Sequence, residues 1–135
     1  MSAKDDCQCS KAPTLIFSCS GASDVGAVAD QAARKLTREG VGNMFCLAGI
    51  GGGISGMIES TKAAAGILAI DSCPIDCARK TLEKAEISAF EHLRLSDLGM
   101  NKGSTPVGDD PISQVVEEGR RKLNGGAAGG GSCCS

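Results

Sequence analysis

Four cysteines recur along the chain at spacings that could bring their thiols together. They are Cys19, Cys46, Cys73 and Cys77, and the first three are separated by intervals of 27 residues. Thiolates are the ligands that zinc accepts in tetrahedral sites, with sulfur about 2.3 Å from the metal. The residue types therefore predict a four-cysteine zinc site, provided that the fold unites these distant segments.

Short apolar runs alternate with amphipathic segments, and this pattern indicates strand–helix units. We expect strands near residues 14–17, 44–48, 67–70 and 90–95, and helices near 24–38, 55–65, 74–85 and 111–123. Such alternation predicts a three-layer α/β/α fold, Rossmann-like and doubly wound, with a mostly parallel sheet of about four strands. The four cysteines fall at or just after the ends of the first three strands. Because parallel strands end at one edge of a sheet, we expect the thiols to converge at the C-terminal edge.

The third cysteine and its neighbour occupy the expected start of a helix. Pro74 suits the first helical position, with Cys73 as the cap and Cys77 one turn further on. Helix N-termini carry partial positive charge and free N–H groups, which favour thiolate over thiol. This placement predicts that both sulfurs are available as ligands.

Composition narrows the classes of partner. The 135-residue chain has a net charge of -2, three Phe, no Trp and no Tyr, so it lacks the basic surface and stacking platform of nucleic-acid binders. The first apolar run, residues 15–17, is too short for a secretion signal, and no run approaches membrane-spanning length. We therefore expect a cytoplasmic protein with a metal ion as partner and no membrane association. In a reducing compartment, eight cysteines indicate metal or thiol chemistry in preference to disulfides.

The expected organisation is one α/β domain between two polar segments. Residues 1–12 form an arm with Cys7 and Cys9, residues 13–123 form the domain, and residues 124–135 form a Gly-rich tail ending in Cys133 and Cys134. The terminal cysteines are interpreted either as accessory thiols that capture metal or complete a second site, or as incidental exposed residues.

Several segments together resemble the DGC domain family of zinc-binding proteins, which is named for an Asp-Gly-Cys motif. The resemblance lies in residues 71–78 (DSCPIDCA), 17–26 (FSCSGASDVG), 44–52 (MFCLAGIGG) and 92–99 (HLRLSDLG), and it covers roughly residues 13–123. It implies that the family's four zinc-binding cysteines correspond to Cys19, Cys46, Cys73 and Cys77. One departure is Ser72, which stands where the motif has glycine. The resemblance implies no reaction, so a metal-binding or metal-handling role is expected more than an enzyme.

A second class of function uses the thiols directly. Cys19, or the pair Cys73 and Cys77, could serve as reactive thiolates in redox, persulfide or sulfur-transfer chemistry. A cysteine phosphatase is disfavoured, because Val25 and Gly26 stand where such an enzyme needs a phosphate-binding Arg.

Three further features have competing interpretations. Residues 51–56 match G-x-G-x-x-G, with Asp71 twenty residues after Gly51, as in dinucleotide-binding folds. The alternative is a glycine turn that lets the backbone approach the expected zinc site. His92, the only histidine, is expected to pack or lie at the surface more than to bind metal. Asp71 and Asp76 are expected to act in turns and helix caps.

Overall fold

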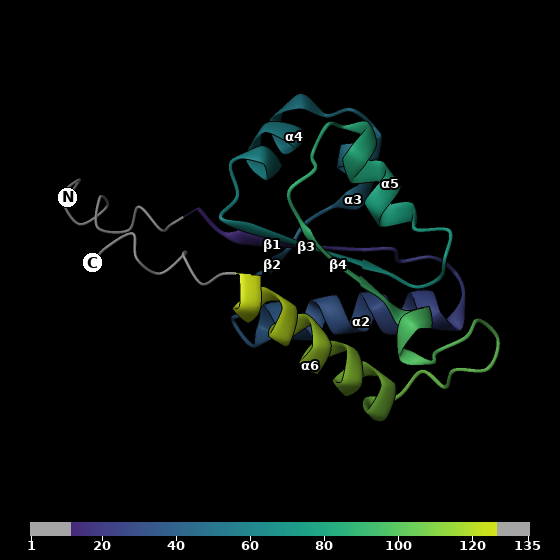
Figure 1. Ribbon diagram of the computed structural model, residues 1–135. Coiled ribbons are helices and arrows are strands. Elements are labelled where there is room, and N and C mark those ends of the chain that lie inside the picture. The colour runs from purple at the N-terminus through teal and green to yellow at the C-terminus, as the bar shows by residue number, and fades with distance from the viewer. Residues whose placement is uncertain (1–11, 127–135) are drawn as a thin grey trace.

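The computed structural model describes residues 12–126, and these form a parallel sheet between two layers of helices (Figure 1). The strands are β1 (Thr14–Ser18), β2 (Asn43–Met44), β3 (Gly66–Asp71) and β4 (Glu91–Arg94). Their order across the sheet is β2-β1-β3-β4, and every neighbouring pair is parallel. The predicted α/β class, with four parallel strands among the described residues, is confirmed.

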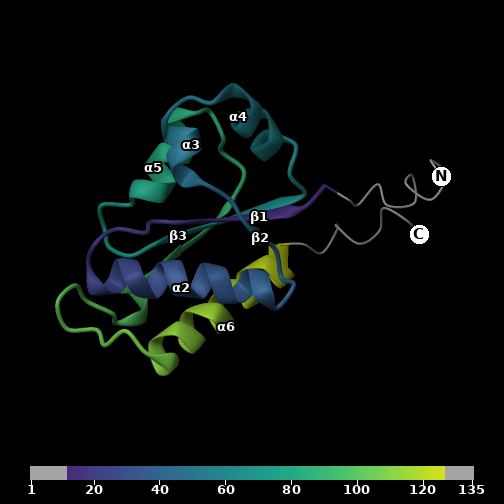
Figure 2. The ribbon, with the colours of Figure 1, turned by 180° about the vertical axis from the view of Figure 1, so that it is seen from behind.

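Helices cover both faces of the sheet (Figures 1 and 2). The helices α2 (Asp24–Arg38) and α6 (Asp109–Gly126) lie on one face, and α3 (Leu47–Gly51), α4 (Ser55–Lys62) and α5 (Cys77–Lys84) lie on the other. The side chains of β1 and β3 alternate between the two resulting cores. Ile16 and Leu68 face the α2/α6 core, whereas Phe17 and Ala69 face the α3/α5 core.

The helix α2 follows the sequence pattern closely. One face of it is fully buried, and its first turn is capped by the Ser23 hydroxyl, which accepts a hydrogen bond from the Gly26 amide at 3.1 Å. A Cβ at Gly26 would come within 2.5 Å of the Gly21 carbonyl oxygen, so only glycine lets the loop after β1 lie this close. The predicted bounds of this helix, 24–38, are confirmed.

The long loop after β4 returns to the start of α2. It follows a 3-10 turn, η2 (Leu95–Leu98), and its Gly103 and Thr105 amides donate to the Asp24 carboxylate at 3.0 and 3.1 Å. These hydrogen bonds, led by the one from Gly103, lower the pKa of Asp24 below its ordinary value of 3.8. The loop is thereby fastened at the same edge of the sheet as the ends of β1 and β3.

The end of the second strand differs from the sequence prediction. The second strand was expected over 44–48, but β2 ends at Met44 and the chain turns into α3. The reason is close helix packing, because a Cβ at Gly49 would meet the Met57 sulfur of α4 at 2.2 Å. The G-x-G-x-x-G segment therefore links α3 to α4 and does not join a strand to a helix, which contradicts a dinucleotide-binding turn.

Other boundaries differ by smaller amounts. The helix α6 continues past Leu123 to Gly126, and β4 lies at an edge of the sheet. Among residues 12–126, no helix combines the length and the apolar character needed to cross a membrane.

Candidate metal centre

The candidate site lies where the order of the strands reverses. From β1 the chain moves outward to β2, and from β3 it moves the other way to β4, so the crevice beyond the ends of β1 and β3 is a topological switch point. Ligands of doubly wound folds bind at such crevices. Cys19 directly follows β1 and Cys73 follows β3 by two residues, and the Cys19 amide donates to the Ile70 carbonyl at 2.9 Å. Two of the predicted ligands therefore sit at the switch point.

The chain between Cys73 and Cys77 is a tight turn and not the start of a helix. The Asp76 amide donates to the Cys73 carbonyl at 3.1 Å, with Pro74 at the turn position that suits its fixed φ. The helix α5 begins only at Cys77, so the prediction that it starts at Pro74 with Cys73 as its cap is wrong. Both thiols nevertheless remain at the edge where the sequence placed them.

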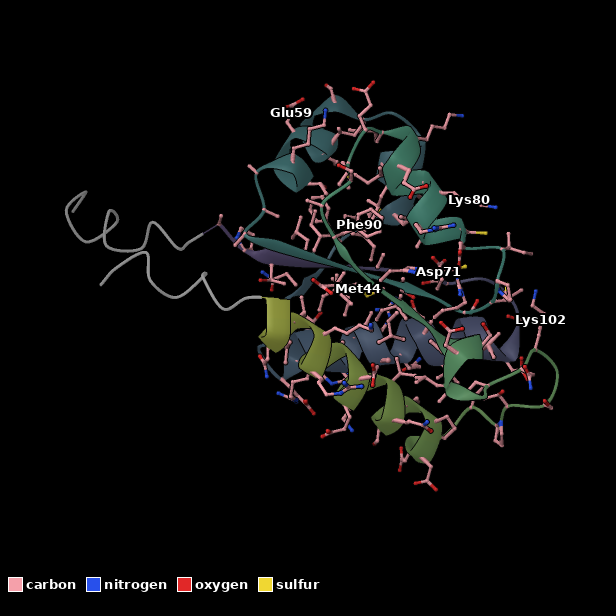
Figure 3. The ribbon with its side chains drawn as sticks, viewed as in Figure 1. Met44, Glu59, Asp71, Lys80, Phe90 and Lys102 are labelled. Carbon is pink, nitrogen blue, oxygen red and sulfur yellow. The ribbon has the colours of Figure 1, made fainter. Side chains whose placement is uncertain are left out.

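The later start of α5 is explained by Asp71, the last residue of β3. This carboxylate is fully buried and accepts hydrogen bonds from the Ala78 amide at 2.7 Å and the Arg79 amide at 3.0 Å. It thus satisfies free N–H groups of the first helical turn from the neighbouring strand. The cap role predicted for Asp71 is confirmed, and Figure 3 shows the residue beside the first turn of α5.

Two of the predicted thiols, Cys19 and Cys73, lie within electrostatic reach of Cys77. Burial is the largest cause that raises the pKa of Cys77, followed by the thiol of Cys19, the carboxylate of Asp71 and the thiol of Cys73. The Ser72 hydroxyl lies 3.8 Å from the Cys19 sulfur, within hydrogen-bonding range of it. A metal cation bound by these cysteines would replace their thiol protons.

Cys46 occupies a different setting at the same edge. It is the N-cap residue of α3, its side chain makes no capping hydrogen bond, and it is exposed. It lines an open pocket of about 740 Å³ together with Ser18 at the end of β1, Arg34 of α2 and Thr81 of α5. Cys46 therefore opens onto the end of β1, which is the segment that leads into Cys19.

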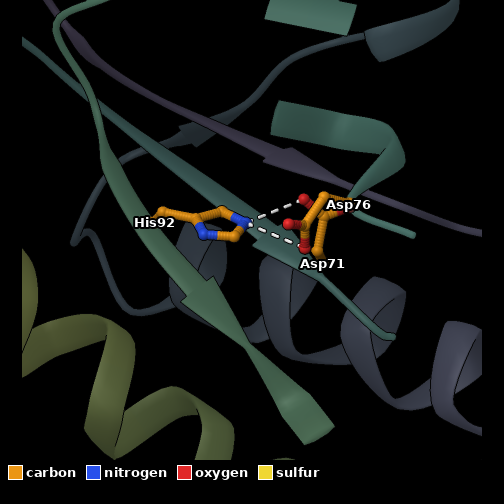
Figure 4. A group of neighbouring side chains, drawn as sticks. All are labelled: Asp71, Asp76 and His92. Carbon is orange, nitrogen blue, oxygen red and sulfur yellow. Dashed lines mark hydrogen bonds and ion pairs between the residues drawn. The ribbon is translucent and has the colours of Figure 1, made fainter. Parts of the chain in front are cut away.

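A cluster of polar side chains lies at the turn between Cys73 and Cys77 (Figure 4). In the part of the chain that the structure describes, Asp71, Asp76 and His92 form the one group whose possible ligand atoms all lie within 4.8 Å of one another. His92 Nε2 lies 2.9 Å from Asp71 Oδ2 and 3.7 Å from Asp76 Oδ1. Among the described residues, no three of the cysteine sulfurs lie this close to one another.

Asp76 is held by an arginine from the edge strand. Arg94 Nε and Nη2 donate to the two carboxylate oxygens of Asp76 at 2.8 and 2.6 Å, and Arg79 Nη2 lies 3.2 Å from the same carboxylate. The Arg94 hydrogen bond is the main cause that lowers the pKa of Asp76, and the pair raises the pKa of Arg94 in turn. Asp76 precedes α5 but makes no capping hydrogen bond, which corrects the cap role expected for it.

Sequence reasoning missed the part that β4 plays. His92 was expected to pack or lie at the surface, but it is half-buried and pairs with Asp71. His92 and Arg94 are two residues apart on a strand, so they project to the same face, and β4 pairs Arg94 with Asp71. Two such residues on one strand, beside a buried strand that ends in Asp, are the signal that could have found the network. The terminal cysteines Cys7, Cys9, Cys133 and Cys134 lie outside the described residues.

Comparisons with known proteins identify a family and one curated relative. Residues 15–118 match the family model described as the DGC domain. A curated protein of Pseudomonas aeruginosa, the anaerobic and virulence modulator AnvM, is 35% identical over 103 residues, which cover 76% of this chain and 76% of that protein. No solved structure matches the chain. The matched region includes all four predicted ligands and the carboxylates behind them.

Proposed function

The chain belongs to the DGC domain family, and on that premise we propose that it binds zinc through the thiolates of Cys19, Cys46, Cys73 and Cys77 at the C-terminal edge of its sheet. The observation that carries the proposal is the gathering of thiols at the switch point, where Cys19 and Cys73 both raise the pKa of Cys77. Cys46 supplies the fourth sulfur from the adjoining pocket. The role is metal binding or handling.

The donor set suits zinc better than it suits harder cations. Zinc takes thiolates readily, whereas magnesium and calcium take oxygen ligands. Four thiolates around Zn²⁺ leave two excess negative charges, and the positive end of α5, which begins at Cys77, lies beside them. The Ser72 hydroxyl adds a donor within range of the Cys19 sulfur. Each sulfur must release its proton to bind, so zinc affinity should fall as the solution is acidified.

The similarity to AnvM supports a binding role. Its name describes a modulator and names no reaction. For this chain, we propose a module that takes up and releases a metal. On this chain, the exposed Cys46 provides the point at which a sulfur could leave the metal for exchange.

A second candidate function is thiol redox or sulfur-transfer chemistry at Cys19. It is favoured by the Ser72 hydroxyl, because a donor beside a sulfur stabilises the thiolate, and by the nearness of Cys77 as a partner thiol. In this case any bound zinc would be secondary, and Cys73 and Cys77 would act as additional reactive thiolates.

One experiment separates the two functions. The full-length chain is purified without added metal, its metal content is measured, and its thiols are titrated before and after chelation. A variant with Cys7, Cys9, Cys133 and Cys134 changed to Ser isolates the four domain thiols. About one zinc per chain, with four thiols protected until chelation, supports the proposal. Absence of metal together with one fast-reacting thiol near neutral pH would overturn it in favour of thiol chemistry.

A further inference from the structure

The residue directly before Cys77 has a backbone conformation that its side chain does not favour. Asp76 has φ 58° and ψ 48°, in the left-handed region that non-glycine residues adopt at a cost. It is also buried, at 2% exposure. Strain of this kind persists only where surrounding contacts hold it, and it often marks a functional position. The direction in which Cys77 leaves the turn depends on this one residue.

The contact that holds Asp76 comes from Arg94 on β4. The guanidinium takes both carboxylate oxygens, at 2.8 and 2.6 Å, which fixes the position and the orientation of the Asp76 side chain. Arg94 is itself anchored by strand pairing to Asp71 of β3. The turn is therefore held from a strand that contributes no cysteine.

The other end of the turn is held in the same way. His92 Nε2 lies 2.9 Å from Asp71 Oδ2, and Asp71 in turn accepts the amides that begin α5. Figure 4 shows the His92 ring pointing at both carboxylates. Two alternate residues of β4 thus hold the two carboxylates that flank the segment with Cys73.

A metal ion at this cluster is not supported by the contacts. Both oxygens of Asp71 already accept backbone N–H groups, and both oxygens of Asp76 already accept Arg94. The guanidinium of Arg79 lies 3.2 Å from Asp76, which adds a second positive charge. A cation entering here would have to displace these hydrogen bonds and face two cations.

We propose that Arg94 and His92 are positioning residues that fix the Cys73–Cys77 turn in its metal-binding shape before any metal arrives. The proposal rests on the proposed zinc site and deepens it. A site shaped in advance loses less conformational entropy when it binds its metal. Groups that hydrogen-bond metal ligands typically contribute 10–100-fold to metal affinity. Arg94 acts one step further away, through the backbone of Asp76 next to Cys77, so we expect an effect near the lower end of that range.

The main test compares Arg94→Gln with Arg120→Gln, which removes an arginine from the distant Glu39 ion pair. Zinc affinity is measured by competition with a chromophoric chelator. We expect Arg94→Gln to weaken zinc about tenfold or more, His92→Gln to weaken it less, and Arg120→Gln to leave it within about twofold. Arg94→Lys should restore only part, because lysine cannot hold both oxygens.

A double-mutant cycle identifies the route of the effect. Asp76→Gly allows the left-handed backbone without the ion pair, so adding Arg94→Gln to it should change zinc affinity by less than about twofold. If Arg94→Gln weakened zinc equally in both backgrounds, Arg94 would act by another route and the proposal would be overturned. It would also be overturned if Arg94→Gln left zinc affinity unchanged.

A readout in the metal-free protein separates this proposal from the zinc proposal. The amide-to-Hα coupling of Asp76 in NMR reports φ, and it should change in Arg94→Gln but not in Arg120→Gln. If the wild type bound no zinc but this coupling moved, the zinc proposal would fail and the positioning of the turn would stand. An unmoved coupling would overturn the positioning role even in a zinc-binding protein.

Discussion

The C-terminal edge of the sheet, where the four predicted cysteine ligands lie, has two sides that are built differently. On the β3 side, the turn from Cys73 to Cys77 is backed by the buried carboxylates Asp71 and Asp76, each held by a residue of β4. On the β2 side, Cys46 is exposed, makes no capping hydrogen bond and opens onto a pocket. Cys46 and Cys77 are both exposed, so the two sides differ in support: buried ion pairs hold the backbone of the turn on the β3 side, whereas Cys46 caps α3 without a side-chain hydrogen bond.

Such a division suits a protein that must bind a metal and release it. Fixed ligands lower the entropy lost on binding, while an exposed ligand can be replaced by an incoming group without disturbing the core. The difference can be tested by changing a residue that supports the β3 side, and by comparing the reactivity of Cys46 and Cys77.

The largest effect is expected when the buried support on the β3 side is removed. Asp71→Asn places an amide NH₂ against N–H donors that the carboxylate now accepts, so buried groups lose their partners. We expect a loss of about 3 kcal/mol in the free energy of unfolding of the metal-free protein, measured by urea denaturation. Zinc affinity should fall with it.

The matched control is Glu83→Gln, which removes the same charge from an exposed position on α5. It should change the free energy of unfolding by less than about 0.5 kcal/mol. Equal effects of the two variants would mean that the loss of charge, and not the helix cap, decides the stability of this side.

A second, smaller effect concerns the order in which the thiols react. In the metal-free variant without terminal cysteines, Cys46 should be alkylated faster than Cys77 at neutral pH, by about threefold or more. Both side chains are exposed, so the expected difference comes from the pKa of Cys77, which partial desolvation, the thiols of Cys19 and Cys73 and the carboxylate of Asp71 raise, and this reduces its reactive thiolate. Mass spectrometry of tryptic peptides separates Cys46 from residues 63–79, which hold both Cys73 and Cys77, and fragmentation of that peptide assigns the alkylation to Cys77.

Faster alkylation of Cys77 than of Cys46 would contradict this expectation, since it would show that the groups around Cys77 do not reduce its reactive thiolate. The Arg94→Gln variant sharpens the test. Loosening the turn should speed the alkylation of Cys77 and leave that of Cys46 unchanged.

Periodicity and strand order accounted for most of the framework. The helix over 24–38, the parallel sheet and the placement of cysteines beyond strand ends all follow from local pattern, because burial on one or both faces dictates which residues are apolar. The hydrogen bonds and ion pairs between different elements do not follow from local pattern. Asp71 capping α5 from β3, and Arg94 holding Asp76 across 18 residues, depend on strand register, which no local pattern contains.

The same limit explains the two misplaced boundaries. Pro74 is a good first helical residue and equally a good second turn residue, and the tertiary contact of Asp71 decides for the turn. Likewise the apolar run 44–48 fits a strand, but the strand ends at Met44 and α3 begins at Leu47, where Gly49 packs closely on Met57. In both cases packing between neighbouring elements outweighed a local preference.

The smallest effect is expected where the edge is closed by an exposed contact. Asp24 holds the loop after η2 through the Gly103 and Thr105 amides, and these bonds lower its pKa below 3.8. A lowered pKa in the folded state means that the contact contributes fully above about pH 3.8 and is lost as the pH falls through the folded value. The Gly103 and Thr105 amide resonances in NMR should therefore shift together with a midpoint below pH 3.8. Asp24→Asn should abolish this titration. The alkylation rates of Cys46 and Cys77 at neutral pH should keep their order, because the Asp24 carboxylate of α2 bonds to the loop amides and not to either cysteine. A midpoint at or above 3.8 would show that these amides do not stabilise the charged form, and the loop would then not belong to the fixed part of the edge.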